Sequence, residues 1–160
     1  MKKVLALASL VCVFGVGCGG DPREAHVTNV LTTLNNTSSQ LGLVKKKLTD
    51  VLKKEKITAE DLKEVNDTVD KIREEGKVLQ DLNRRIGAET EKKPLSKEEL
   101  QTYKNKFAGQ IESAMDGLNQ ETRAVIPLVD DLEKKNKQLA QELRKKLRDA
   151  DAEFQQIVSR

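Results

Sequence analysis

Apolar side chains recur along most of the chain at alternating steps of three and four residues, the spacing of one face of an α-helix. In the first of these runs seven of the eight positions are apolar, which favours an amphipathic helix over a strand. Three further runs begin at Leu62, Leu100 and Val129. The pattern predicts four helical segments, the first with its apolar face at Val27, Val30, Leu34, Thr37, Leu41, Val44, Leu48 and Val51.

Three short motifs indicate where these helices begin. Asp21 precedes a proline and stands three residues before Glu24, which predicts an N-cap with a capping-box partner. Thr58 and Ser96 each stand three residues before an acidic residue and directly after an apolar one, which also predicts an N-cap with a capping-box partner. The sequence therefore predicts helix starts near residues 22, 59 and 97.

Two weak points accompany these starts. Residues 35–42, NNTSSQLG, have poor helix propensity and predict a bend or fraying in the first helix. Gly87 follows the last apolar position of the second run and predicts its C-terminal cap.

Pro127 leaves two arrangements open for the third and fourth segments. Proline can open a fourth helix, which gives an up-down-up-down bundle whose segments have about 30 residues each. The apolar pattern also continues in phase from Leu118 to Leu132, which fits one long helix kinked at Pro127. We predict an all-α fold, an antiparallel and coiled-coil-like helical bundle, and favour four separate segments over the kinked long helix.

Composition agrees with long helices and argues against several functions. The 160 residues are enough for one domain, and 37% hydrophobic with 34% charged residues suits helices with a narrow apolar stripe. Lysine and arginine number 29 against 26 acidic residues, and two of those bases are Lys2 and Lys3. The remaining excess is too small to indicate a nucleic-acid partner.

The first eighteen residues carry a targeting pattern. Two lysines precede an apolar run of eleven residues, Val4 to Phe14, which has the length of a signal-peptide core. A membrane span needs about 20 apolar residues, so this run is too short to cross a bilayer. Small residues at 15–17 then lead to Cys18.

The stretch GVGC at residues 15–18 resembles the lipobox of bacterial lipoproteins, although Gly15 stands where that family prefers leucine. The resemblance implies a removed signal peptide at residues 1–17, a lipidated Cys18 carrying acyl chains such as palmitate, a tether at 18–21 and a helical domain at 22–160. Gly19 after the cysteine, instead of aspartate, implies an outer-membrane anchor facing the periplasm. The alternative is an ordinary secretory signal that is cleaved elsewhere.

No motif for a reaction or a cofactor accompanies this pattern. His26 has no Glu-x-x-His partner, and Cys12 would leave with the signal peptide, so we predict no catalytic residue, metal site or cofactor. Asn136, on an apolar face, either fixes the register of the helices or is tolerated there. The basic clusters at 45–47 and 144–146 are interleaved with acids, which favours a solvated helix face over a lipid-binding one.

The sequence thus predicts a non-enzymatic envelope protein anchored to a membrane through Cys18. Its structural, scaffolding or protein-binding role would use the helix faces, with a protein partner or a second copy at the apolar seams. The alternative is a periplasmic chaperone-like or ligand-carrier bundle.

Overall fold

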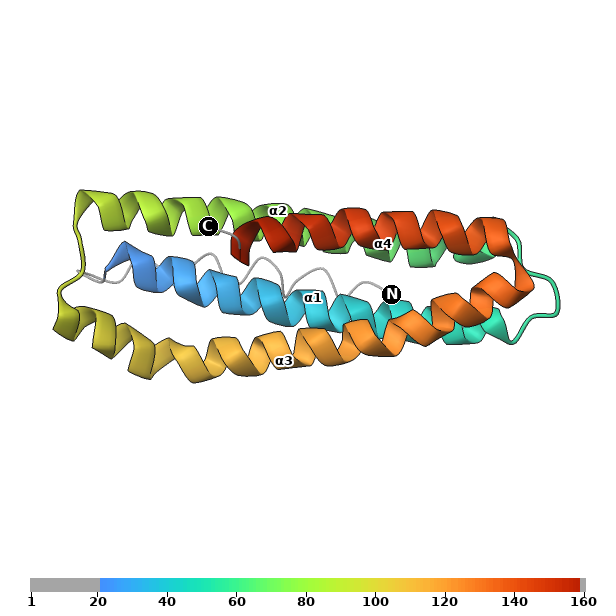
Figure 1. Ribbon diagram of the computed structural model, residues 1–160, viewed down its shortest axis with the longest axis horizontal. Coiled ribbons are helices and arrows are strands. Elements are labelled where there is room, and N and C mark those ends of the chain that lie inside the picture. Colours follow the sequence, from blue (N-terminus) through green and yellow to red (C-terminus); the bar gives the residue numbers. More distant parts are fainter. Residues whose placement is uncertain (1–20, 159–160) are drawn as a thin grey trace, which may run out of the picture.

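Four α-helices account for nearly all of residues 21–158, which are the residues that the computed structural model describes (Figure 1). They are α1 (Pro22–Leu52), α2 (Lys63–Lys92), α3 (Lys97–Lys135) and α4 (Lys137–Val158), and a short 3-10 turn, η1 (Glu60–Leu62), precedes α2. No strand occurs in this part of the chain. The predicted all-α helical bundle with four segments is confirmed.

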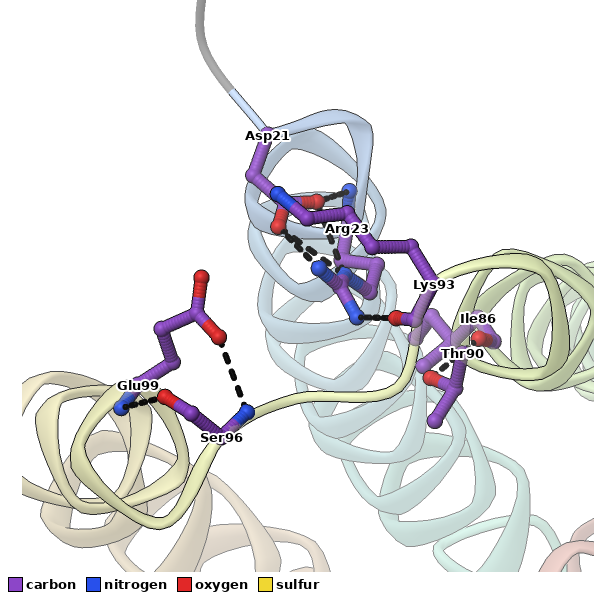
Figure 2. A network of polar contacts seen from close by, with 7 residues as sticks. All are labelled: Asp21, Arg23, Ile86, Thr90, Lys93, Ser96 and Glu99. Carbon is purple, nitrogen blue, oxygen red and sulfur yellow. Dashed lines mark hydrogen bonds and ion pairs between the residues drawn. The ribbon is translucent and has the colours of Figure 1, made fainter.

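Chain direction alternates from helix to helix, but the order around the bundle is not the chain order. Helix α1 packs against α2 and α3, and α4 packs against the same two helices. Within residues 21–158, α1 and α4 lie diagonally opposite each other, and so do the consecutive helices α2 and α3. The bundle is therefore arranged α1–α2–α4–α3, and the α2–α3 connection must cross a diagonal. That crossing passes the start of α1 (Figure 2).

The two ends of the bundle hold separate apolar clusters. We call the end with Ile57 and Asn136 the corner end, and the end with Asp21 and Lys93 the clasp end. The larger cluster lies towards the corner end and draws buried residues from all four helices. The smaller cluster lies towards the clasp end and takes its buried residues from α1, α2 and α3 only: Leu31, Leu34, Leu79, Phe107 and Ala114.

Helix α1 follows its predicted apolar face without interruption from Pro22 to Leu52. The expected bend or fraying at residues 35–42 is wrong. The hydroxyls of Thr33, Thr37 and Ser39 donate to the carbonyl oxygens four residues earlier, at 2.9, 2.9 and 3.0 Å. Their polar groups are satisfied within the helix, so Thr37 can be buried to 1% exposure without leaving an unpaired hydroxyl.

The corner between α3 and α4 lies at Asn136, so the favoured arrangement of four separate segments is confirmed. The start of the fourth helix at Pro127 is wrong, and so is the alternative of one long helix kinked there. Pro127 lies inside α3 on its exposed side, where water can satisfy the carbonyl that loses its helical partner. Asn136 instead takes an extended conformation, with φ −152° and ψ 95°. Its Nδ2 donates to the Ile57 carbonyl at 3.2 Å and its Oδ1 accepts from the Leu139 amide at 3.3 Å. Asn136 therefore ends one helix, starts the next and ties both to the α1–α2 loop.

The end of α2 also differs from the prediction. Gly87 lies within the helix, which continues to Lys92. Lys93 is extended, with φ −138° and ψ 92°, and precedes Pro94. Because a proline disfavours the helical conformation of the residue before it, Pro94 rather than Gly87 sets this boundary.

The predicted helix starts are confirmed at two of three positions. Ser96 and Glu99 form a complete capping box, and Asp21 caps α1 by accepting from the Arg23 amide at 2.9 Å. At the third, the Asp61 carboxylate accepts from the backbone and hydroxyl of Thr58, both at 2.8 Å, and the chain makes a 3-10 turn before α2 begins at Lys63.

Candidate functional site: an apolar groove

An apolar groove of about 1070 Å³ runs along the side of the bundle where α3 and α4 face each other. Helices α1 and α2 form its floor, through Val27, Val30, Leu34, Ile72, Leu79 and Ile86. Helices α3 and α4 form its walls, through Ile111, Met115, Leu118, Ile126, Leu147 and Phe154. Pockets of 300–1,000 Å³ commonly hold small molecules, so this groove is large enough for one.

The groove exists because α3 and α4 are held to different floor helices. Lys45 of α1 pairs with Glu121 of α3 at 2.7 Å. On the other side, Lys146 of α4 pairs with Asp70 of α2 at 2.7 Å, and the Gln80 amide donates to the Glu153 carbonyl at 2.8 Å. The two walls meet at the Asn136 corner, and Figure 1 shows α1 lying in view between α3 and the α2–α4 pair.

Gly76 sets how closely α4 lies on α2. A Cβ atom at this position would lie 2.7 Å from the Glu153 Cβ and 3.2 Å from the Phe154 ring. The glycine therefore makes the close approach of the two helices possible. The same contact places Phe154 against both apolar clusters, where it lines the groove.

The charged side chains that line the groove belong to its walls, on α3 and α4: Asp130, Arg144, Arg148 and Asp151. Arg144 of α4 pairs with Asp130 of α3 and with Glu133, and these hydrogen bonds raise the pKa of Arg144 above its ordinary value. On the floor, the buried hydroxyl of Thr37 is used within α1. Among the described residues, the buried side-chain oxygen that lacks a partner is Tyr103 Oη, and Tyr103 is not part of the groove lining. The floor is therefore mostly hydrocarbon, with Thr37 and Asn83 as its polar side chains.

A buried ion pair closes the clasp end (Figure 2). Arg23, which is 3% exposed, holds the Asp21 carboxylate with its guanidinium and donates through Nη1 to the Lys93 carbonyl at 2.8 Å. The hydrogen bond from Arg23 lowers the pKa of Asp21 from 3.8 to about 2. This clasp fastens the first turn of α1 to the diagonal α2–α3 connection.

The sequence missed Arg23 and assigned its neighbour Glu24 to a capping box. Glu24 instead pairs with Lys106 of α3 at 2.9 Å. An arginine two residues after an N-cap aspartate was the available signal, but its second partner is 70 residues away along the chain. The groove left no such signal, because the apolar runs predict four segments of similar length and do not indicate that α4 is the shortest.

The other predicted site residues divide into those the structure describes and those it does not. Cys18, Cys12 and the signal segment 1–17 lie outside the described residues, so lipidation of Cys18 stays a prediction. His26 lies half-buried on α1. No group of three His, Cys, Asp or Glu side chains within residues 21–158 is arranged to hold a metal ion. None of the helices in that range is long and apolar enough to cross a bilayer.

The two basic clusters are largely neutralised by acids from neighbouring helices. Lys45 and Lys47 pair with Glu121 and Glu64, while Arg144 and Lys146 have the partners given above. Comparison of the chain with protein-family models, with curated proteins and with solved structures found no match. The residues of the chain, and those of the groove above all, are therefore the guide to its function.

Proposed function

We propose that this chain is a lipid-anchored protein of the bacterial envelope with a non-catalytic binding or scaffolding role, and that the apolar groove is its binding surface. The groove of about 1070 Å³ is the observation that carries the binding role. The resemblance of residues 15–18 to a lipobox carries the location.

A short tether supports the anchored arrangement. Asp21 is the N-cap of α1, so only Gly19 and Gly20 separate Cys18 from the helical body. Two extended residues reach about 7 Å, which would hold the clasp end against the lipid headgroups. Two or more acyl chains give stable membrane attachment, because each buried methylene contributes about 0.8 kcal/mol.

The exposure of apolar side chains supports a binding role. Soluble proteins rarely leave a large contiguous apolar surface uncovered unless it contacts something. Ile126 on the groove wall is 55% exposed, while Ile111 and Met115 are only partly covered. An apolar floor with ion pairs on the walls suits binding better than proton transfer or nucleophilic attack, which need convergent titratable groups.

The groove also favours a second candidate, a ligand-carrier bundle. On α1 the lining runs from Val27 to Leu41, which corresponds to about 21 Å of helix. A channel of that length and composition suits an elongated apolar molecule. A carrier would release such a molecule on organic extraction of the purified protein, whereas a scaffold would show a stoichiometric protein partner or a defined homo-oligomer.

Replacement of Cys18 tests the location. Cys18→Ser should leave the chain unlipidated, uncleaved and held at the membrane by its signal segment. Cys12→Ser is the matched control, since Cys12 lies in the segment that is removed, and that variant should be processed normally. A soluble, mature-sized product from Cys18→Ser would refute the lipoprotein assignment.

Binding of the fluorescent dye ANS, which reports accessible apolar surface, tests the groove. The wild-type body should bind the dye, and Ile111→Glu inside the groove should weaken binding several-fold. Leu43→Glu is the matched control, because Leu43 is 44% exposed and lies outside the groove lining. Equal dye binding by both variants would show that the groove is not the binding surface.

A further inference from the structure

We propose that the groove receives an acyl chain of the protein's own anchor, which folds back from Cys18 when the protein is outside a membrane. This inference depends on the lipidation of Cys18 proposed above. It assigns the groove an occupant of stated chemistry, a saturated or unsaturated hydrocarbon chain linked to the same polypeptide.

The start of α1 lies close to one end of the groove. Val27, the first groove residue on α1, follows the Asp21 N-cap by six residues, or about 9 Å of helix. The three residues from Cys18 to Asp21 span about 10 Å when extended. A lipid on Cys18 therefore starts within about 20 Å of the groove, less if the glycines of the tether turn back towards α1.

The groove is open towards the clasp end, where α4 ends and α1 begins. Glu153 of α4 lies beside Gln80 of α2, and α4 extends five residues beyond this contact, to Val158. Helix α2 continues twelve residues beyond it, to Lys92, and its Ile86 lines the exposed stretch of floor. A chain approaching from the clasp end meets Val27 and Ile86 without having to pass under α4.

The chemistry of the floor selects hydrocarbon over a peptide. An inserted peptide brings a donor and an acceptor at every residue, and each of these needs a partner once it is buried. Most floor side chains, among them Val27, Val30, Leu34 and Leu79, have no polar atoms to offer, and Asn83 supplies the one exposed amide on this surface. A hydrocarbon chain needs none, so it can fill this surface without leaving a hydrogen bond unmade.

Covalent attachment favours the protein's own acyl chain over a free lipid or a second copy. A ligand tethered by a few residues is held at an effective concentration in the millimolar range, which a dilute free lipid does not reach. The Arg23–Lys93 contact fixes the first turn of α1, from which the tether departs, relative to the groove floor. The entrance is thereby held in place without help from the bilayer.

Cysteine labelling measures whether the groove is occupied. Ile111→Cys places a thiol in the groove wall, and Val78→Cys places one on α2 at a site that is 46% exposed and outside the groove lining. Each variant is prepared lipidated, freed of membrane and detergent, and as an unlipidated chain beginning at residue 18 with Cys18→Ser. Both apolar clusters lie between Leu31 and Ala150, so this chain keeps the whole core. Lipidation should slow maleimide labelling at position 111 at least tenfold and leave position 78 unchanged, whereas equal rates at 111 would overturn the proposal.

A second experiment tests whether the groove binds a free acyl chain, independently of whether the protein's own acyl chain occupies it. The unlipidated chain is titrated with a pyrene-labelled sixteen-carbon fatty acid. Ile111→Glu should weaken its binding at least tenfold and Val78→Glu should not, with Ile111→Ala as the variant that trims the wall without adding charge. Binding of this probe together with equal labelling rates at 111 would show that the groove takes free acyl chains and that the protein's own anchor is not the occupant.

Mass spectrometry of the same samples distinguishes the two proposals. A lipidated Cys18 with an open groove and no fatty-acid binding would overturn the occupant while the anchor stands. An unmodified Cys18 would overturn both the anchor and its role as occupant of the groove.

Discussion

The corner end and the clasp end of the bundle use their apolar residues differently. At the corner end all four helices contribute, and Leu48, Leu132 and Leu143 are 0–1% exposed. At the clasp end three helices supply the buried core, and residues such as Val30 and Met115 pack against it while remaining partly exposed. The same kind of amphipathic helix thus forms a tightly packed core at one end and a partly exposed one at the other, and the groove borders both.

This difference teaches that a single short helix can divide a bundle into a region that stabilises the fold and a region with apolar surface available for binding. Helix α4 has 22 residues against 39 in α3, so it covers only part of the surface that α3 presents. The corner end can supply most of the free energy of unfolding, while the clasp end keeps apolar surface accessible. The Arg23 clasp and the Ser96–Glu99 capping box compensate with polar contacts where the fourth helix does not reach.

The largest expected effect comes from removing a side chain of the closed core. Leu132→Ala at the corner end should lower the free energy of unfolding by about 2–5 kcal/mol, because the side chain is fully buried and leaves a cavity. Met115→Ala in the groove wall should cost less than about 1.5 kcal/mol, since it is already partly exposed. Urea denaturation of both variants measures the difference, and equal losses would show that the two ends are packed alike.

The second effect concerns the contact that positions α4 at the boundary between the two ends. Gly76→Ala should destabilise the protein by about 2 kcal/mol, because the new methyl group would overlap Glu153 and Phe154 and push α4 outwards. Gly109→Ala is the control on α3, where a Cβ meets nothing within 4 Å, and it should stabilise the protein by about 0.5–1 kcal/mol. Thermal unfolding gives both values, and a gain from both substitutions would disprove the close approach.

Features determined by neighbouring residues were predictable from the sequence. The apolar face of α1 and the caps at Asp21 and Ser96 depend on residues within one or two turns, and they were predicted correctly. The Pro127 boundary failed because an exposed proline can stay inside a helix that tertiary packing supports. The actual corner depends on a bond from Asn136 to Ile57, 79 residues earlier, which no local pattern reveals.

The groove was predictable only in outline. The sequence predicted that binding would use the apolar seams of the helices. The position of the groove between α3 and α4 depends on which helices are neighbours. That order follows from contacts such as Lys45 with Glu121 and Asp70 with Lys146, each more than 70 residues apart. Helical periodicity specifies which face of a helix is apolar and leaves open which helix will cover it.

A smaller effect is expected from opening the clasp. Arg23→Met should lower the free energy of unfolding by about 1 kcal/mol, because the Lys93 carbonyl loses its side-chain donor and the Asp21 carboxylate keeps only the backbone amide of residue 23. Arg84→Met is the control, since Arg84 is 77% exposed and its pair with Asp81 should contribute less than about 0.5 kcal/mol. Hydrogen exchange of the first turn of α1 should accelerate in the first variant only, and unchanged protection there would show that the clasp holds nothing.

The smallest expected effects are changes in stability with pH and salt that depend on one carboxylate at each end, Asp21 at the clasp end and Asp61 at the corner end. The pKa values of Asp21 and Asp61 are both lowered from 3.8 to about 2, by hydrogen bonds from Arg23 and from Lys54 respectively. A lowered pKa in the folded state adds stability above about pH 4 that is lost as the pH falls towards 2. Asp21→Asn and Asp61→Asn should therefore each be less stable than wild type at pH 6, and the difference should shrink on acidification through that range.

Salt should then distinguish the two ends. Lys54 is 54% exposed, so about 1 M salt should screen its attraction to Asp61 and reduce the cost of Asp61→Asn at pH 6. Arg23 is 3% exposed and Asp21 25%, so salt should screen this pair less than the Lys54 pair, and the cost of Asp21→Asn should change less. Unfolding measured at low and high salt compares the two variants directly. If both costs fell equally, the clasp would be as accessible to solvent as the surface pair, and α1 would not be firmly fixed to the α2–α3 connection at the mouth of the groove.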